Sequence, residues 1–197
     1  MWIVFDYGEV ISTRTAALPT MASMLGVSAE AFGEGYWAVR DAYDRGQSDL
    51  EYWRAVGGIV GASVTPELAA ELTEVDIEGW LQPDPESLAL LDELADLPLA
   101  LLSNAPSSFG RVAERQEWAK DFRHLVFSGD LGVAKPDPEI WTALAEQLGA
   151  APEDCVFFDD RQTNIDGALA AGMGGVLWLG AVPAREELVR LGVLGAG

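Results

Sequence analysis

Short, continuous apolar runs recur along the chain and predict buried strands. They are "WIVF" (2–5), "PLALL" (98–102), "LVF" (125–127), "CVFF" (155–158) and "VLWL" (176–179). Continuous rather than alternating runs are typical of strands whose two faces are both covered. Helical stretches lie between the runs, and this order of strands and helices predicts an α/β fold with a doubly wound parallel sheet.

Several helix ends are also indicated by the sequence. Asp84-Pro85 and Asp137-Pro138 each place an N-cap residue before a proline at the first helical position. Gly149 is expected to end the helix that starts at Pro138. The stretch "TNIDGALAAG" predicts a further helix that ends at Gly172.

The segment 14–83 breaks this alternation because it contains no convincing strand. Ser48 and Glu51 form a capping-box pattern before "LEYWRAV", and Thr65 precedes the proline that opens "PELAAEL". The sequence therefore predicts a catalytic core of residues 1–13 and 84–197 and a helical cap of residues 14–83. Ligands bind at the carboxyl ends of the strands in such sheets, so an insert that leaves this end is expected to cover the site.

The composition is that of one globular domain, with or without an inserted subdomain. The chain has 197 residues, of which 49% are hydrophobic, so a sizeable core can be buried. A single cysteine, Cys155, excludes an intrachain disulfide, and the short, non-basic start is not typical of a signal peptide. No apolar run approaches the roughly 20 residues of a membrane helix. We expect a cytoplasmic protein, either a monomer or a homodimer.

The net charge of −20 narrows the class of partner. With 32 acidic and 12 basic residues, the surface is unsuited to nucleic acid and to anionic membranes. A small phosphorylated ligand would also be repelled at long range. Such a ligand would need a metal cation or a few placed hydrogen-bond donors at its binding site.

Polar side chains follow the apolar runs at four places, which a parallel sheet brings to one edge. They are Asp6, Ser103-Asn104, Lys135 and Asp159-Asp160. Taken singly, these residues could be turn or helix caps or a surface lysine. The adjacent carboxylates of the last pair repel each other unless a cation or a proton offsets their charge. Together the four places indicate a Mg²⁺ site for a phosphoryl group, with a carboxylate in reach to act as nucleophile.

Four stretches resemble the motifs of the haloacid dehalogenase-like (HAD) hydrolase superfamily, in the family's order. They are "VFDYGEV", "LLSNA", "AKPDPEIW" and "VFFDDRQTNIDGA", and the insert after the first resembles the family's C1-type cap. The resemblance implies that Asp6 is the nucleophile and a metal ligand. It implies a second metal contact from the backbone carbonyl of Gly8.

The resemblance also assigns the remaining motif residues. Ser103 matches a phosphate ligand with Asn104 beside it, and Lys135 matches the lysine that steadies the nucleophile and the phosphoryl group. Asp160 matches the direct metal carboxylate, and the residues expected to act on the metal through water are Asp159 and Asn164.

The chain departs from the family pattern at Gly8. Family phosphatases usually carry a second aspartate here, which protonates the leaving oxygen and then activates water. Such general acid–base help is worth about 10²–10⁴-fold in rate. Some sugar-phosphate phosphatases of the superfamily resemble this chain in having glycine at this position. Glu9 is a weak candidate for a substitute acid.

Three interpretations follow from this departure. The first is a Mg²⁺-dependent phosphatase of small phosphate monoesters that works through an aspartyl-phosphate, with sugar phosphates among its substrates, because a sugar 1-phosphate leaves easily. The second is a 2-haloacid dehalogenase with the same nucleophile, since halide needs no proton; it leaves the acidic pair unexplained. The third is a phosphate- or metal-binding regulatory homologue without turnover. We favour the first.

The predicted cap offers candidate substrate-binding side chains. The stretch "GYWAVRDAYDRGQ" contains aromatic and polar residues close together, among them Tyr43 and Arg45. Arg161 follows the acidic pair and is a third candidate. Aromatic faces with a few polar groups suit a sugar, although the same aromatics could pack one helix on the next. His124 has no metal-ligating neighbour in sequence and is expected to be structural.

Overall fold

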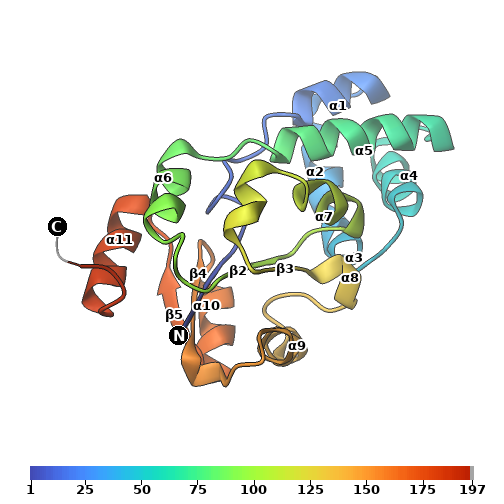
Figure 1. Cartoon of the computed structure of the whole chain (residues 1–197). Coiled ribbons are helices and arrows are strands. Elements are labelled where there is room, and N and C mark those ends of the chain that lie inside the picture. The colour runs from blue at the N-terminus through green and yellow to red at the C-terminus, as the bar shows by residue number, and fades with distance from the viewer. Residues whose placement is uncertain (196–197) are drawn as a thin grey trace.

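The computed structural model describes residues 1–195 and contains a five-stranded parallel sheet. The strands are β1 (Trp2–Phe5), β2 (Leu99–Ser103), β3 (His124–Phe127), β4 (Cys155–Asp159) and β5 (Gly174–Leu177), in the order β3-β2-β1-β4-β5 (Figure 1). The α/β fold with a parallel sheet, predicted from the apolar runs, is confirmed. The central strand β1 is the one that leads into Asp6.

The register of the sheet brings the ends of three strands to one edge. Phe5, the last residue of β1, pairs with Leu101 of β2 and with Phe158 of β4. The residues that follow in each strand, or just beyond it, therefore emerge together. Sequence-distant polar groups meet at this edge because parallel strands all point the same way.

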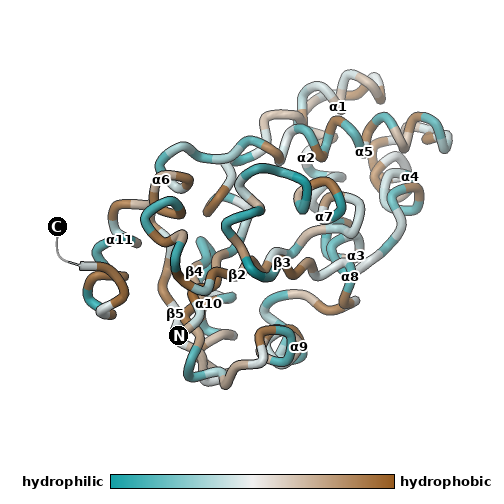
Figure 2. Tube along the Cα trace, in the orientation of Figure 1, coloured by the Kyte–Doolittle hydropathy of each residue, from teal (hydrophilic) through white to brown (hydrophobic). Residues whose placement is uncertain are grey.

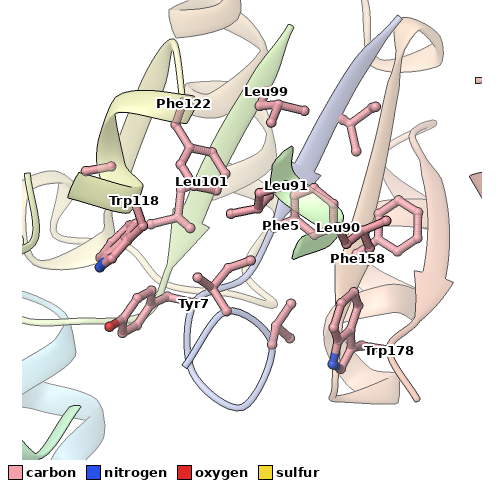
Figure 3. Close-up of a cluster of buried hydrophobic side chains, with 14 of the residues drawn as sticks. Phe5, Tyr7, Leu90, Leu91, Leu99, Leu101, Trp118, Phe122, Phe158 and Trp178 are labelled. Atoms are coloured by element: carbon pink, nitrogen blue, oxygen red, sulfur yellow. The ribbon is translucent and has the colours of Figure 1, made fainter. Parts of the chain in front are cut away.

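Both faces of the sheet are covered by helices. Along β1, Ile3 and Phe5 belong to one hydrophobic cluster and Val4 to the other, which explains why the strand is apolar at every position. Figure 3 shows the first cluster, in which Phe5, Leu101 and Phe158 of the sheet gather near Leu90 and Leu91 of a covering helix.

Different helices line the two faces. The first cluster takes residues from α6 (Pro85–Glu93), α7 (Ser107–Ala113), the short 3-10 helix η1 (Glu117–Asp121) and α11 (Ala181–Arg190). The second takes residues from α9 (Pro138–Leu148) and α10 (Gln162–Ala170). Two short helices complete the core, α8 (Ser128–Leu131) and η2 (Pro152–Asp154).

A helical insert leaves the sheet after β1 and returns before β2, as predicted. Its helices are α1 (Leu18–Leu25), α2 (Ala29–Ala38), α3 (Arg40–Asp44), α4 (Asp49–Val60) and α5 (Pro66–Trp80), and they lie to one side of the sheet (Figure 1). The insert has a hydrophobic cluster of its own, built around Tyr36, Tyr52 and Trp53. An isolated bridge joins Ser12 to Pro83, where the two connections to the insert run side by side. The exact limits of core and cap stay a prediction.

Most of the indicated helix ends match the structure. The capping box of Ser48 and Glu51 is present at α4, the side chain of Thr65 caps α5, and Gly149 ends α9 in the left-handed conformation. Asp137 differs: it precedes α9, but its side chain accepts no bond from the helix. Its carboxylate bonds Arg45 of the cap instead.

The hydropathy pattern follows this layered arrangement. Figure 2 shows hydrophobic positions along β2 and β3 and a mixture of hydrophobic and hydrophilic positions along α5. Among residues 1–195, no helix has the length and apolar character required to cross a membrane. His124 packs its ring edge-on against Trp2, with ring centroids 5.3 Å apart.

Candidate active site

Asp6 follows the last residue of β1 and is held at the sheet edge by its neighbours. Its backbone N–H donates to the carbonyl of Phe158 at 2.9 Å. Its Oδ1 accepts from the backbone N–H of Tyr7 at 2.7 Å and lies 2.8 Å from Nζ of Lys135. Burial raises the pKa of Asp6 to about 7, against the opposing effect of the Lys135 charge. The carboxylate is fixed in orientation and depends on nearby positive charge.

Lys135 reaches the same edge from the segment between α8 and α9. Its ammonium contacts Asp6, donates to Oδ2 of Asp159 at 2.8 Å and donates to the carbonyl of Leu102 at 2.8 Å. The side chain is 1% exposed. Three acceptors therefore surround three ammonium hydrogens, and the lysine bridges two buried carboxylates.

Asn104 holds the backbone of this lysine. Its amide nitrogen donates to the carbonyl of Lys135 at 2.9 Å, and its Oδ1 accepts from the N–H of Lys135 at 2.8 Å. The pair of bonds ties the end of β2 to the lysine segment. In this structure Asn104 positions Lys135, and Ser103 is buried at the end of β2 in the lining of the adjoining cavity.

The two carboxylates after β4 have different surroundings. Asp159 is fully buried and accepts hydrogen bonds from Lys135, from the side chain of Asn164 at 2.9 and 3.0 Å and from the N–H of Arg161 at 2.8 Å. Asp160 is partly exposed. Desolvation and then the charge of Asp159 raise its pKa. The protein donates four hydrogen bonds to Asp159, whereas Asp160 lines the cavity and accepts none from the side chains and backbone of residues 1–195.

Together these side chains form an acidic cluster that could hold a metal ion. One oxygen each of Asp6, Asp159 and Asp160 lies within 4.8 Å of the others. Carboxylate oxygens are the ligands that Mg²⁺ prefers. The lysine supplies one positive charge against three negative ones, so the cluster favours a further cation.

A cavity of about 290 Å³ opens between this cluster and the cap. Its core lining includes all the predicted motif residues except Asp159, which lies beneath the surface: Asp6, Gly8, Ser103, Asn104, Lys135, Asp160 and Asn164. The cavity has the size of a small-molecule site.

The three predicted substrate-binding residues have different positions. Arg161 lines the cavity. Tyr43 and Arg45 do not: the Tyr43 hydroxyl donates to Asp49 at 2.7 Å, and the Arg45 guanidinium pairs with Asp41 and Asp137. The structure therefore brings Arg161 to the site and engages the other two in contacts within the cap and between cap and core.

The cap residues that do face the cavity were not among the three chosen candidates, although four of them lie in the predicted substrate-binding stretch "GYWAVRDAYDRGQ". They are Trp37, Arg40, Asp41, Asp44 and Trp80. Four of these recur at spacings of three or four residues, with Trp37 in α2 and the other three in α3. This spacing was the available signal for a shared face, but it does not by itself say which face of the helices turns toward the cavity.

The family follows from a match that covers most of the chain. Residues 3–172 match the model of the haloacid dehalogenase-like hydrolases. The chain belongs to this family. It is a HAD-family hydrolase, and the fold, the insert after β1 and the order of the four motifs all agree with that membership.

Relatives of this HAD hydrolase include phosphatases. A flavin mononucleotide hydrolase from Arabidopsis thaliana is 32% identical over 106 residues, which cover 53% of this chain and 43% of that protein. A phosphatase from Mycobacterium tuberculosis is 33% identical over 131 residues, which cover 64% of this chain and 60% of that protein. The match thus spans about half the length of these two relatives.

Solved structures share the fold at low sequence identity. A HAD family enzyme from Bacteroides thetaiotaomicron, in complex with magnesium and inorganic phosphate, has a TM-score of 0.70 at 18% identity and covers 89% of this chain and 92% of its own. An L-2-haloacid dehalogenase from Xanthobacter autotrophicus has a TM-score of 0.74 at 19% identity, over 98% of this chain and 84% of its own. These likenesses show the fold alone.

Proposed function

We propose that this HAD hydrolase is a Mg²⁺-dependent phosphatase of small phosphate monoesters. The observation that carries the proposal is the excess of negative charge around Lys135: its ammonium contacts Asp6 and Asp159, and an oxygen of a third carboxylate, Asp160, lies within 4.8 Å of theirs beside a small cavity. A dehalogenase needs the nucleophile but gives no reason for two further carboxylates. A divalent cation and a phosphoryl group account for all three.

The residues present fit a magnesium ion. Asp6, Asp160 and the backbone carbonyl of Gly8 would be direct ligands, with Asp159 and Asn164 acting through water. Among the described residues, no donor contacts the carboxylate of Asp160, which leaves both of its oxygens available. When bound, Mg²⁺ supplies positive charge next to the phosphoryl oxygens.

The reaction proposed for this site uses Asp6 as nucleophile. Its carboxylate attacks phosphorus, the bond from phosphorus to the leaving oxygen breaks, and an aspartyl-phosphate forms on Asp6. Water then cleaves this acyl-phosphate, which restores the carboxylate and releases inorganic phosphate. Lys135 opposes the burial that raises the pKa of this carboxylate and holds it in orientation, and the hydroxyl of Ser103 would donate to a phosphoryl oxygen.

Gly8 restricts the substrates to those with a good leaving oxygen. No side chain at position 8 can donate a proton, and the place where a Cβ would lie is 3.6 Å from the indole of Trp80. The departing group must leave with little protonation in the transition state. The hemiacetal oxygen of a sugar 1-phosphate is less basic than an ordinary alkoxide, so such esters suit the site.

A substrate screen tests this proposal against the two alternatives. Phosphate esters and 2-haloacids are incubated with the enzyme, each with Mg²⁺ and with a chelator. We expect phosphate release with Mg²⁺ and none with the chelator. Halide release that is indifferent to the chelator would support a dehalogenase instead. Metal binding without turnover of any compound would support a regulatory protein.

A further inference from the structure

Five cap residues face the phosphoryl site from above, and we call them the cap roof: Trp37, Arg40, Asp41, Asp44 and Trp80. The organic part of a substrate held by its phosphoryl group at Asp6 would extend toward the cap roof. The charges and hydrogen-bonding groups of the cap roof therefore decide which organic part is accepted.

The cation of the cap roof is already neutralised. The Nε of Arg40 donates to Oδ1 of Asp44 at 2.8 Å, and its terminal nitrogen lies 3.2 Å from Oδ2 of Asp76. The guanidinium is 11% exposed and lies over three tyrosine rings, with centroids 5.1, 5.3 and 5.9 Å away. Two carboxylates thus surround one buried guanidinium. The positive charge of Arg40 is therefore already neutralised and is not available to an anionic substrate.

The carboxylates of the cap roof keep acceptor capacity. Asp44 uses Oδ1 for Arg40, and within residues 1–195 nothing in the protein donates to its Oδ2. Both oxygens of Asp41 accept from Nε of Arg45 at 3.0 Å, and this side chain is 78% exposed, so a further lone pair on each oxygen can still accept a hydrogen bond. The cap roof therefore presents negative charge and hydrogen-bond acceptors toward the cavity, with the indoles of Trp37 and Trp80 beside them.

Two further cations line the cavity, Lys135 and Arg161, and both belong to the core rather than to the cap roof. Arg161 lies directly after Asp160, and the carboxylates of Asp160 and Glu9 line the same side of the cavity. A carboxylate on the organic part of a substrate would meet acidic groups on both sides of the cavity.

We propose that the cap roof selects phosphate esters whose organic part is uncharged and carries hydroxyl groups, and that it disfavours esters whose organic part carries a carboxylate. This inference rests on the proposed phosphatase function. Hydroxyl groups can donate to Asp41 and Asp44, and the apolar face of a polyol ring can pack on indole. A carboxylate brought to the same place suffers like-charge repulsion and loses water without a compensating donor.

A matched pair of substrates tests this selectivity. Glucose 1-phosphate and glucuronic acid 1-phosphate leave through the same anomeric oxygen and differ by CH₂OH against carboxylate. With Mg²⁺, and at high salt to screen the net charge of the protein, kcat/KM should favour the glucose ester by about tenfold or more, because juxtaposed like charges cost upwards of 1.4 kcal/mol. p-Nitrophenyl phosphate serves as a substrate without either group.

Charge-removing variants show whether the cap roof causes the preference. Asp44→Asn and Asp41→Asn should each narrow the ratio of the two kcat/KM values severalfold. Asp41 is exposed, so its variant remains informative if Asp44→Asn folds poorly. Asp154→Asn is the matched control, because this exposed residue precedes β4 at the opposite end of the sheet and should leave the ratio unchanged.

The outcomes separate this inference from the phosphatase assignment. Cleavage of p-nitrophenyl phosphate with an equal or reversed preference within the sugar pair would overturn the cap-roof proposal and leave the phosphatase function intact. The same holds if neither sugar ester is cleaved, or if both roof variants keep the wild-type ratio. Failure to cleave any phosphate ester with Mg²⁺ would overturn both.

Discussion

The ammonium of Lys135 lies 2.8 Å from Oδ1 of Asp6, and the lysine side chain is almost fully enclosed. The same ammonium is 2.8 Å from Oδ2 of Asp159. Without this cation, two buried carboxylates would face each other at the end of the central sheet. Lys135 therefore orients the nucleophile Asp6 and also stabilises the folded core.

Replacing this lysine should damage activity and stability together. For Lys135→Met we expect turnover to fall at least about 100-fold, because Asp6 loses the cation that keeps it ionised and oriented. We also expect a loss of about 3–5 kcal/mol in the free energy of unfolding in the presence of chelator, as when one partner is removed from a buried ion pair. Urea unfolding measures this loss.

Magnesium and a second lysine variant provide the controls. Mg²⁺ should restore part of the stability of Lys135→Met, since it offsets the same carboxylates. Lys120→Met removes an exposed lysine that pairs with Glu117 and should change stability by less than about 1 kcal/mol. Equal stability of Lys135→Met and the wild type in chelator would contradict this account of the site.

Restoring a carboxylate at position 8 should broaden the substrates. A Cβ at Gly8 makes ordinary contact with Trp80, so a side chain can start there. Gly8→Asp should raise kcat/KM for simple alkyl phosphates about tenfold or more, because the leaving oxygen gains a proton donor. Gly8→Ala tests the added bulk alone and should give no such gain. A rise in both variants, or in neither, would argue against the missing acid as the cause of selectivity.

Arg45 joins cap to core through Asp137, and a double-mutant cycle tests whether this is its role. If this ion pair holds the cap against the core, Arg45→Ala and Asp137→Ala should change KM to a similar extent. The double variant should then have a KM close to that of either single variant. Steady-state kinetics on one phosphate ester measures all four proteins. A larger KM for Arg45→Ala alone, with additive effects, would instead assign Arg45 to the substrate.

The buried cluster in the cap predicts an unusual pH dependence of stability. Desolvation raises the pKa of Asp44 to about 6, in spite of Arg40, and the negative charge of Asp76 raises it further. The folded state thus holds this proton more tightly than the unfolded state, so stability from this group is present below pH 4 and is lost as the pH rises through 6.

Asp44→Asn removes that titration. The free energy of unfolding of the variant, relative to that of the wild type, should therefore rise by on the order of 2–3 kcal/mol between pH 4 and pH 8. Urea unfolding at both values measures it. A difference that is constant with pH would show that Asp44 is ionised in the fold without penalty.

Sequence alone was sufficient to locate the edge of the sheet where the site lies. Parallel strands share a direction, so residues that follow "WIVF", "PLALL" and "CVFF" had to emerge together. The helical insert was equally readable, because the caps at Ser48 and Thr65 are local signals that depend on the next three residues.

The rotation of the cap helices could not be predicted in the same way. It depends on tertiary packing, and α2 ends at Ala38 with Val39 outside the helix before α3 begins. Tyr43 consequently stacks on Tyr52 with ring centroids 4.0 Å apart, while Arg40 and Asp44 face the cavity. The prediction that the Asp137 side chain caps α9 was wrong for a related reason. Its carboxylate binds Arg45, which lies far away in sequence.

The covalent state of Asp6 during turnover tests the central claim most directly. A phosphate ester is mixed with enzyme and Mg²⁺, the reaction is quenched in acid within milliseconds, and the peptide that contains Asp6 is examined by mass spectrometry. The account predicts a phosphoryl group on the Asp6 carboxylate, and its absence, together with loss of turnover, in Asp6→Asn. Turnover with Asp6 unmodified, or undiminished phosphate release by Asp6→Asn, would contradict it.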